Sequence, residues 1–421
     1  MERKKIIVVG GGFSGIQLVE NLDENQFDVL LIDKLNHHQF QPLFYQVATS
    51  QLEPGSISFP LRKIFQNRKN TQIRMAEVLA VLSDKKQIET SKGFFDFDYL
   101  VIASGCRTNF FGNPNLEKFT YGLKTTYDAI KIRNHILQSF ENLVSVEDSE
   151  REYLLNIVIV GAGPTGVEMA GAFAEIKRQI LPKDFPDIDF TSLRIILLEG
   201  SPHTLNSMSK MAQGASEKYL VRMGVEVKTA VFVKNYDGRL ATLSNGETIK
   251  TAHVIWAAGV AGNLLSGIGE ESIFNKNRYR VNRFNEILHY PGIYAVGDIC
   301  YMETPKYPNG HPQLANVAIN QAKNLARNLK AIKNGKPLRE FEYINLGSMA
   351  TIGKHKAVVD LPFVSFKGYF AWFVWMFLHL MLILSVRNKL IIFINWAWNY
   401  FTKDTSLRLI LTESQKVKGK E

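Results

Sequence analysis

Two glycine-rich loops of the form Gly-x-Gly-x-x-Gly carry the clearest chemical signal in the sequence. Glycine at these positions lets the backbone turn tightly and approach a pyrophosphate, which then binds to amides at a helix N-terminus. One such loop is weak support for a nucleotide site, but this chain contains two. The first consists of Gly10, Gly12 and Gly15, and the second of Gly161, Gly163 and Gly166.

An acidic residue after the first loop strengthens this interpretation. Apolar runs at residues 5–9 and 27–33 are predicted strands on either side of a helix, and Asp33 ends the second strand 18 residues after Gly15. A carboxylate at this place accepts hydrogen bonds from a ribose. A tight turn that happens to precede a strand-end carboxylate is the alternative, and it explains less of the pattern.

The second loop also precedes an acid at a strand end. Glu199 ends the predicted strand 193–200, 33 residues after Gly166, and we attribute the long gap to an extended helix and loop around residues 178–190. No Lys or Arg follows Glu199 directly, and a carboxylate repels a 2′-phosphate. This half of the pattern therefore favours NADH over NADPH.

The elements that must position these loops occur twice. Matching strands are predicted at residues 97–105 and 253–259, and each ends in a small-small-Gly turn. A further strand, 291–298, ends in Gly297-Asp298, which is either a helix cap or the place where a flavin's ribityl or phosphate is held. The duplicated strand-loop-helix-strand order predicts an α/β fold with two Rossmann-like dinucleotide-binding domains.

Composition suits a globular chain of two or three domains, with 421 residues, 46% hydrophobic and 21% charged. The formal charge of +10 indicates an anionic partner. Residues 346–421 contain ten Lys/Arg and four acidic residues, a net +6, together with the longest apolar stretch. This combination favours an anionic bilayer surface over nucleic acid.

The apolar stretch, residues 369–386, contains His379 but no Asp, Glu, Lys or Arg, and is nearly long enough to span a bilayer. A second apolar piece follows at residues 390–401. Two interfacial helices in one leaflet are favoured over one transmembrane span, and a buried helix pair in a dimer is a third alternative. The interfacial interpretation depends on four tryptophans, which prefer the headgroup region: Trp372, Trp375, Trp396 and Trp398.

The number and spacing of the cysteines bear on disulfide, zinc and redox sites. Cys106 and Cys300 are the only cysteines, and they form no Cys-x-x-Cys motif. A disulfide framework, a zinc site and a dithiol redox centre therefore lack support, no metal is expected, and the compartment is predicted to be reducing. No signal peptide fits the N-terminus, because its apolar run leads straight into the glycine loop.

Longer motifs resemble a known family. IIVVGGGFSGI, IASGCRTNFFG, IVIVGAGPTGVEMAG and YAVGD resemble the two-dinucleotide-binding-domain flavoproteins. HHQFQPLFYQVAT, HPQLANVAINQAKNLARNL and GSMATIGKHKAVVDL then resemble the type II NADH:quinone oxidoreductases, which are non-pumping respiratory NADH dehydrogenases. The resemblance covers nearly the whole chain. It implies an FAD-binding domain (1–112 and 271–345), an NADH-binding domain (113–270) and an amphipathic, helical membrane-anchoring region (346–421).

The resemblance also implies the cofactor contacts. FAD would be held by Gly10, Gly12, Phe13, Ser14, Gly15, Asp33, Lys34, Val78, Ala103, Ser104, Gly105, Gly297, Asp298 and Ala315. NADH would be held by Gly161, Gly163, Pro164, Thr165, Gly166, Glu199, Ala258 and Gly259.

Candidate catalytic residues follow from the same resemblance. Glu168 matches a family carboxylate between nicotinamide and flavin, although it could simply be an acid in the first turn of a helix. Asn316 and Asn320 stand where the family has two glutamines near the flavin and the quinone, and Asn keeps the amide on a shorter side chain. Tyr45 and Gln46 are further quinone-binding candidates, or core residues beneath the flavin.

The implied reaction passes a hydride from NADH to FAD and two electrons on to a menaquinone or ubiquinone, at the cytoplasmic face of the inner membrane. Proton pumping is not expected, because no chain of intramembrane carboxylates occurs. A homodimer is compatible with these features. The alternatives are a sulfide:quinone oxidoreductase, which needs redox cysteines, a soluble ferredoxin or rubredoxin reductase, which has no use for the tail, and a non-catalytic NADH sensor.

Overall fold

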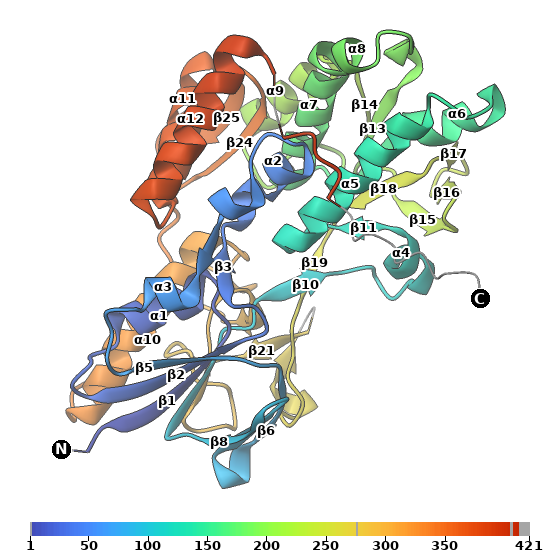
Figure 1. Cartoon of the computed structure of the whole chain (residues 1–421). Helices are drawn as coiled ribbons and strands as arrows, with labels where there is room; N and C mark the ends of the chain where they lie inside the picture. Colours follow the sequence, from blue (N-terminus) through green and yellow to red (C-terminus); the bar gives the residue numbers. More distant parts are fainter. Residues whose placement is uncertain (1, 275–276, 405–406, 412–421) are drawn as a thin grey trace, which may run out of the picture. The chain divides into compact units, whose positions relative to one another are not determined.

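The computed structural model describes residues 2–274, 277–404 and 407–411, so the basic end of the chain, 412–421, lies outside the described residues. The chain forms two compact units (Figure 1). The first unit comprises residues 1–39, 58–107 and 260–346. The second comprises residues 40–57, 108–259 and 347–421.

The first unit is built on a parallel sheet with the strand order β22-β9-β1-β2-β5. Alternate residues of β1 enter two cores, with Ile6 and Val8 in one and Ile7 and Val9 in the other. Both faces of this strand are buried, which explains its unbroken apolar sequence. The strands are β1 (Lys4–Val9), β2 (Phe27–Asp33), β5 (Thr71–Met75), β9 (Tyr99–Ile102) and β22 (Ile293–Ala295).

Helix α1 (Phe13–Asn21) follows β1 and packs beside α10 (Ala315–Lys333), as Figure 1 shows. Ala322, Leu325 and Leu329 of α10 are buried in the same core as α1. A small antiparallel sheet completes this part of the unit and consists of β6 (Val78–Leu82), β7 (Gln87–Thr90) and β8 (Gly93–Asp96).

The second unit has the same architecture, with a parallel sheet in the strand order β11-β18-β12-β13-β14. Its strands are β11 (Tyr121–Gly122), β12 (Asn156–Val160), β13 (Arg194–Leu198), β14 (Val225–Lys228) and β18 (His253–Trp256). The predicted duplication is therefore confirmed. So is the explanation of the long gap before Glu199, because α7 (Pro164–Gln179) has 16 residues against nine in α1, and α8 (Leu181–Asp184) follows it.

Further helices and an antiparallel sheet also belong to the second unit. They are α2 (Phe44–Ala48), α4 (Pro114–Phe119), α5 (Thr126–Asn142), α6 (Asp148–Leu155), α9 (Lys210–Arg222), and an antiparallel sheet of β15 (Val233–Tyr236), β16 (Leu240–Leu243) and β17 (Thr248–Lys250).

The C-terminal part of the second unit is a three-stranded antiparallel sheet followed by two helices. The strands are β24 (Ser348–Gly353), β25 (Lys356–Asp360) and β26 (Ser365–Gly368), and the helices are α11 (Tyr369–Leu382) and α12 (Val386–Thr402). Gly171 of α7 lets this sheet approach closely, because a Cβ at residue 171 would lie 2.2 Å from the carbonyl oxygen of Ile352.

The tail forms two helices, as expected. Asn388 fixes α12 to the unit by donating from its side-chain amide to the carbonyl oxygens of Gly55 (3.1 Å) and Ser56 (2.8 Å). Within the described residues, none of the helices combines the length and the apolar character that crossing a bilayer requires.

Candidate active site

The first glycine loop has the tight geometry that its sequence predicts. Gly10 has a φ of +110°, and a Cβ on it would lie 2.3 Å from the carbonyl oxygen of Ala103 at the end of β9. A Cβ on Gly15 would lie 1.8 Å from the carbonyl oxygen of Gly10. Gly12, in contrast, faces open space, with no atom within 4 Å of an added Cβ. The loop is closed toward the protein and open on its outer side.

Asp33 is bound to this loop rather than free at the strand end. Its Oδ2 accepts a hydrogen bond from the amide of Gly11 (2.6 Å), and its Oδ1 accepts one from Leu35 (2.7 Å). Burial raises the pKa of Asp33 although both amides favour its charged form. The neighbouring Lys34 forms an exposed ion pair with Glu77 (2.5 Å). The carboxylate therefore stands beside the open face of the loop.

The second loop repeats this arrangement. Gly161 has a φ of +99°, a Cβ on it would lie 2.9 Å from backbone atoms of Ala258, and a Cβ on Gly166 would lie 1.8 Å from the carbonyl oxygen of Gly161. Glu199 accepts a hydrogen bond from the amide of Ala162 (2.6 Å) and another from the amide two residues beyond itself (2.7 Å). Both units therefore contain the same loop-and-acid device, which we define as a glycine loop whose backbone amide donates a hydrogen bond to the acid at the end of the following strand.

The predicted Gly297-Asp298 turn lies against the first loop. Gly297 has a φ of +79°, and a Cβ on it would lie 2.9 Å from Oγ of Ser14 at the start of α1. The side chain of Gln321 accepts a hydrogen bond from the Gly297 amide (2.8 Å). The thiol of Cys106 donates to Oδ2 of Asp298 (3.0 Å), a contact that the sequence reading did not anticipate.

The structure divides the predicted site residues between the two units. The FAD set lies in the first unit, including Phe13, Val78, Ser104, Gly105 and Ala315, and the NADH set lies in the second, including Gly163, Pro164, Thr165 and Gly259. Asn316 and Asn320 lie in the first turns of α10, where the side-chain amide of Asn320 donates to the carbonyl oxygen of Asn316 (2.8 Å). Tyr45, Gln46 and Glu168 belong to the second unit.

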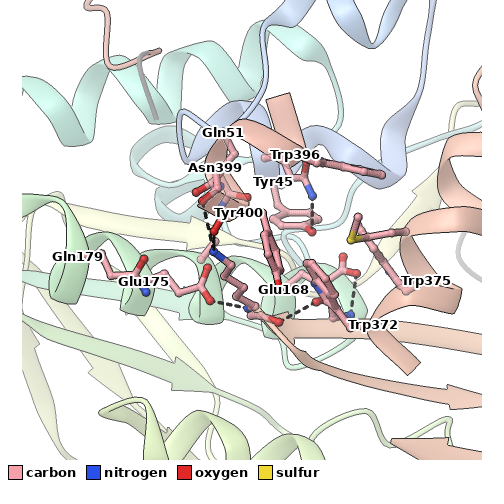
Figure 2. A pocket seen from close by; sticks show the side chains of 16 residues that line it. Tyr45, Gln51, Glu168, Glu175, Gln179, Trp372, Trp375, Trp396, Asn399 and Tyr400 are labelled. Carbon is pink, nitrogen blue, oxygen red and sulfur yellow. Dashed lines mark hydrogen bonds between the residues drawn. The ribbon is translucent and has the colours of Figure 1, made fainter. Parts of the chain in front are cut away.

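A cavity in the second unit brings together Tyr45, Gln46 and Glu168 (Figure 2). About 600 Å³ of space not filled by protein atoms lies among its lining residues, open solvent included. Its walls come from α2, α7, the β24–β25 hairpin, α11 and α12. The other lining residues are Gln51, Ala172, Glu175, Gln179, Thr351, Gly353, Lys354, Trp372, Trp375, Met376, Trp396, Asn399 and Tyr400.

Glu168 is the buried acid of this cavity, with 7% of its surface exposed. Burial raises the pKa of its carboxyl to about 8. The amide of Thr351 donates to it (3.3 Å), and the Trp375 indole, although its N–H makes no hydrogen bond of regular geometry, offsets part of the rise. Glu168 lies beyond the first turn of α7, so the alternative of a first-turn acid on the helix dipole is wrong.

Tyr45 and Gln46 are tied to the C-terminal helices by a chain of hydrogen bonds. The side-chain amide of Gln46 donates to the hydroxyl of Tyr45 (2.8 Å), and the indole of Trp396 donates to the side-chain oxygen of Gln46 (2.8 Å). Burial raises the pKa of Tyr45 well above its usual value, and the nearby charge of Glu168 adds to this rise. The hydroxyl thus stays neutral and accepts the hydrogen bond from Gln46.

Three of the four tail tryptophans lie elsewhere than the sequence interpretation placed them. Trp372, Trp375 and Trp396 line the cavity, and only Trp398 is well exposed, at 60%. The reason is geometric, because residues three and four positions apart share one helix face and this face packs inward. Glu175 was also missed, although its spacing of seven from Glu168 placed it on the same face of α7.

Comparison with known proteins gives concordant matches over both parts of the chain. The family described as pyridine nucleotide-disulphide oxidoreductase matches residues 4–322, and the NDH2 C-terminal domain matches residues 345–403. Two Mycobacterium tuberculosis proteins, the type II NADH:quinone oxidoreductases Ndh and NdhA, are 33% and 34% identical to this chain. The alignments cover 98% and 94% of this chain and 91% and 87% of theirs.

Solved structures agree at the level of the fold. The structure of NDH2 from Plasmodium falciparum in complex with NADH has a TM-score of 0.89 at 22% identity, with 98% of this chain and 100% of that chain covered. The sulfide:quinone oxidoreductase from Aquifex aeolicus has a TM-score of 0.73 at 19% identity, with coverage of 95% and 96%.

Proposed function

We propose that this chain, which belongs to the type II NADH:quinone oxidoreductase family, oxidises NADH through FAD and reduces a membrane quinone. The observation that carries the proposal is the repeated loop-and-acid device, one copy in each unit, with Glu168 on the same helix as the second loop. Two dinucleotide sites would allow hydride transfer from NADH to FAD, and a buried acid can supply a proton to the quinone.

The residues of the first loop fit FAD. Gly10 and Gly15 meet backbone atoms so closely that no side chain could replace their hydrogens, whereas the side at Gly12 is open for a pyrophosphate. We assign FAD to the first unit, with Asp33 at the ribose and Asp298 at the ribityl. When bound, FAD supplies the redox chemistry, accepting a hydride and returning two electrons.

NADH is assigned to the second loop, in the second unit. Its pyrophosphate would lie on the α7 N-terminus, and its adenosine ribose would lie at Glu199. Since α7 also carries Glu168 two residues after Gly166, the loop and the acid are held by one rigid element. This arrangement supports a reacting end of NADH close to the cavity.

NADPH is expected to be a poorer donor than NADH by roughly 10- to 100-fold in kcat/KM, because Glu199 repels a 2′-phosphate. Glu199→Gln should narrow this ratio, mainly by improving NADPH, in steady-state assays with both donors. Glu141→Gln, which removes an exposed acid on α5 of the same unit, is the matched control. An unchanged NADH/NADPH ratio in Glu199→Gln would refute the role of this carboxylate.

The quinone is assigned to the cavity around Glu168, with Tyr45 and Gln46 as neighbouring polar contacts. Quinone reduction consumes protons, and Glu168, with its pKa raised to about 8, holds a proton at neutral pH. For Asn316 and Asn320, at the start of α10 in the first unit, contact with the quinone stays a prediction. The assignment to sulfide oxidation gains no support from Cys300, since burial raises the pKa of its thiol to about 12.

The C-terminal helices are proposed to lie on an anionic membrane surface, on the cytoplasmic face of the inner membrane and without proton pumping. Their outward side chains are strongly apolar, with Phe370, Phe377 and Phe401 exposed at 69%, 62% and 81%. A contiguous apolar surface of this kind marks a membrane or protein contact. A homodimer formed through the same helices is compatible with this proposal.

The flavin spectrum of the purified protein tests the function directly. Anaerobic NADH should bleach the spectrum, and menaquinone or ubiquinone should restore it. A colourless protein that does not take up FAD, or a yellow protein that NADH does not bleach, would overturn the proposal and leave a non-catalytic NADH-binding role.

A further inference from the structure

A second acidic side chain of α7 faces the cavity that contains Glu168. Glu168, Ala172, Glu175 and Gln179 all line it, at spacings of four, three and four residues that place them on one helix face (Figure 2). Exposure increases along this stripe, since Glu168 is buried whereas Glu175 and Gln179 are partly exposed. The stripe therefore runs from partly exposed side chains to the buried acid.

The backbone around Glu175 is shaped to receive its carboxyl. The amide of Lys354 donates a hydrogen bond to Oε1 of Glu175 (2.5 Å). Gly353 has a φ of +134°, and a Cβ on it would lie 2.9 Å from the same oxygen. Any side chain at residue 353 would therefore displace the Glu175 carboxyl from the cavity wall.

Charged groups around Glu175 come from several elements. Lys354 and Lys356 of the β24–β25 hairpin and Arg178 of α7 favour its charged form, yet burial prevails and raises the pKa of Glu175. Tyr45 of α2 also interacts with this carboxyl. The ammonium group of Lys354 is engaged elsewhere, because it donates to backbone carbonyl oxygens at the end of α12. Glu175 thus lies on the stripe between the buried Glu168 and the partly exposed Gln179, and its pKa is higher than that of an ordinary carboxyl.

We propose that Glu175 relays to Glu168 the proton that quinone reduction takes from solvent, an inference that rests on the proposed function. The overall reaction is NADH + H⁺ + quinone → NAD⁺ + quinol. The hydride brings two electrons and one hydrogen nucleus, so one further proton comes from water. Glu175 loses its carboxyl proton toward Glu168 and regains one from solvent, and no electron moves in this step.

The two carboxyls are separated by seven residues of helix, roughly 10 Å along its axis. Water molecules in the cavity, which Ala172 also lines, would bridge this distance. Glu175 is accordingly a relay residue that acts through Glu168 and does not contact the quinone.

Glu175→Gln in the FAD-loaded full-length protein tests the relay. Turnover with a short-chain quinone should fall about 10-fold, with a larger solvent deuterium isotope effect and an altered pH profile, because proton delivery becomes limiting. Turnover with ferricyanide, an acceptor that takes no proton, should stay unchanged, as should FAD content. In infrared titration of the loaded protein, the signal of one titrating carboxyl should be absent from the variant.

Glu175→Asp is the conservative variant, and it should restore much of the quinone turnover. Wild-type quinone turnover and isotope effect in Glu175→Gln would overturn the relay. So would an equal loss of quinone and ferricyanide turnover, which indicates a merely structural role. Failure of the proposed function is distinct from both, because then NADH does not bleach the flavin of the wild-type protein.

Discussion

Glu168→Gln is expected to lower quinone turnover by roughly 100-fold, the scale at which a positioned proton donor contributes to a reaction. The amide has the shape of the acid and can still accept the hydrogen bond from Thr351. It cannot exchange a proton, however. Steady-state turnover with a short-chain quinone, at matched FAD content, measures the effect.

Two comparisons make this result specific. Glu247→Gln removes an exposed carboxyl of the same unit and should leave quinone turnover unchanged. The affinity of Glu168→Gln for NADH should also stay within a few-fold of the wild type, because the second loop is intact. If Glu168→Gln keeps more than half of the wild-type quinone turnover, the assignment of Glu168 as the proton donor is wrong.

Glu168→Gln is also expected to change how the stability of the folded protein depends on pH. The folded protein raises the pKa of Glu168 from 4.5 to about 8, so folding favours the protonated form. Stability is therefore lost as pH rises from about 4.5 to about 8, by at most about 5 kcal/mol. Glu168→Gln escapes this loss, and its Tm relative to the wild type should be higher at pH 8.5 than at pH 5.5.

The nucleotide loops were predictable because their constraints are local. A Cβ on Gly15 or Gly166 would clash with the backbone five residues earlier, so the glycine spacing alone predicts the turn. The strands that flank the loops are buried on both faces and read as unbroken apolar runs. In both units the acid at the end of the next strand accepts a hydrogen bond from the loop, so its place could be predicted together with the loop.

The cavity was not predictable, because it depends on contacts that are distant in sequence. Gly171 gives no sign in the sequence that β24 lies 2.2 Å from its missing Cβ. The inward orientation of Trp396 becomes visible only through its hydrogen bond to Gln46, 350 residues away. An aromatic residue on an apolar helix suits a membrane interface and a cavity wall equally well, and composition alone cannot distinguish the two.

Membrane binding is expected to be lost in a Phe370→Asp/Phe377→Asp/Phe393→Asp variant. These side chains are 69%, 62% and 52% exposed, and none of them lines the cavity. Transferring each into lipid is worth about 1.5–3 kcal/mol, so replacing all three should lower partitioning onto anionic vesicles at least about 1000-fold. Vesicle co-sedimentation measures this directly.

The triple variant should also separate the loss of membrane binding from any effect on catalysis. Turnover with a long-chain quinone in vesicles should fall together with binding, whereas turnover with a short-chain quinone in solution should stay near the wild-type value, because the cavity wall is intact. Phe94→Asp, at a side chain 57% exposed in the first unit, is the matched control and should still bind vesicles. If the triple variant still sediments with vesicles but no longer dimerises, the apolar face of α11 and α12 is a protein interface and the membrane assignment fails.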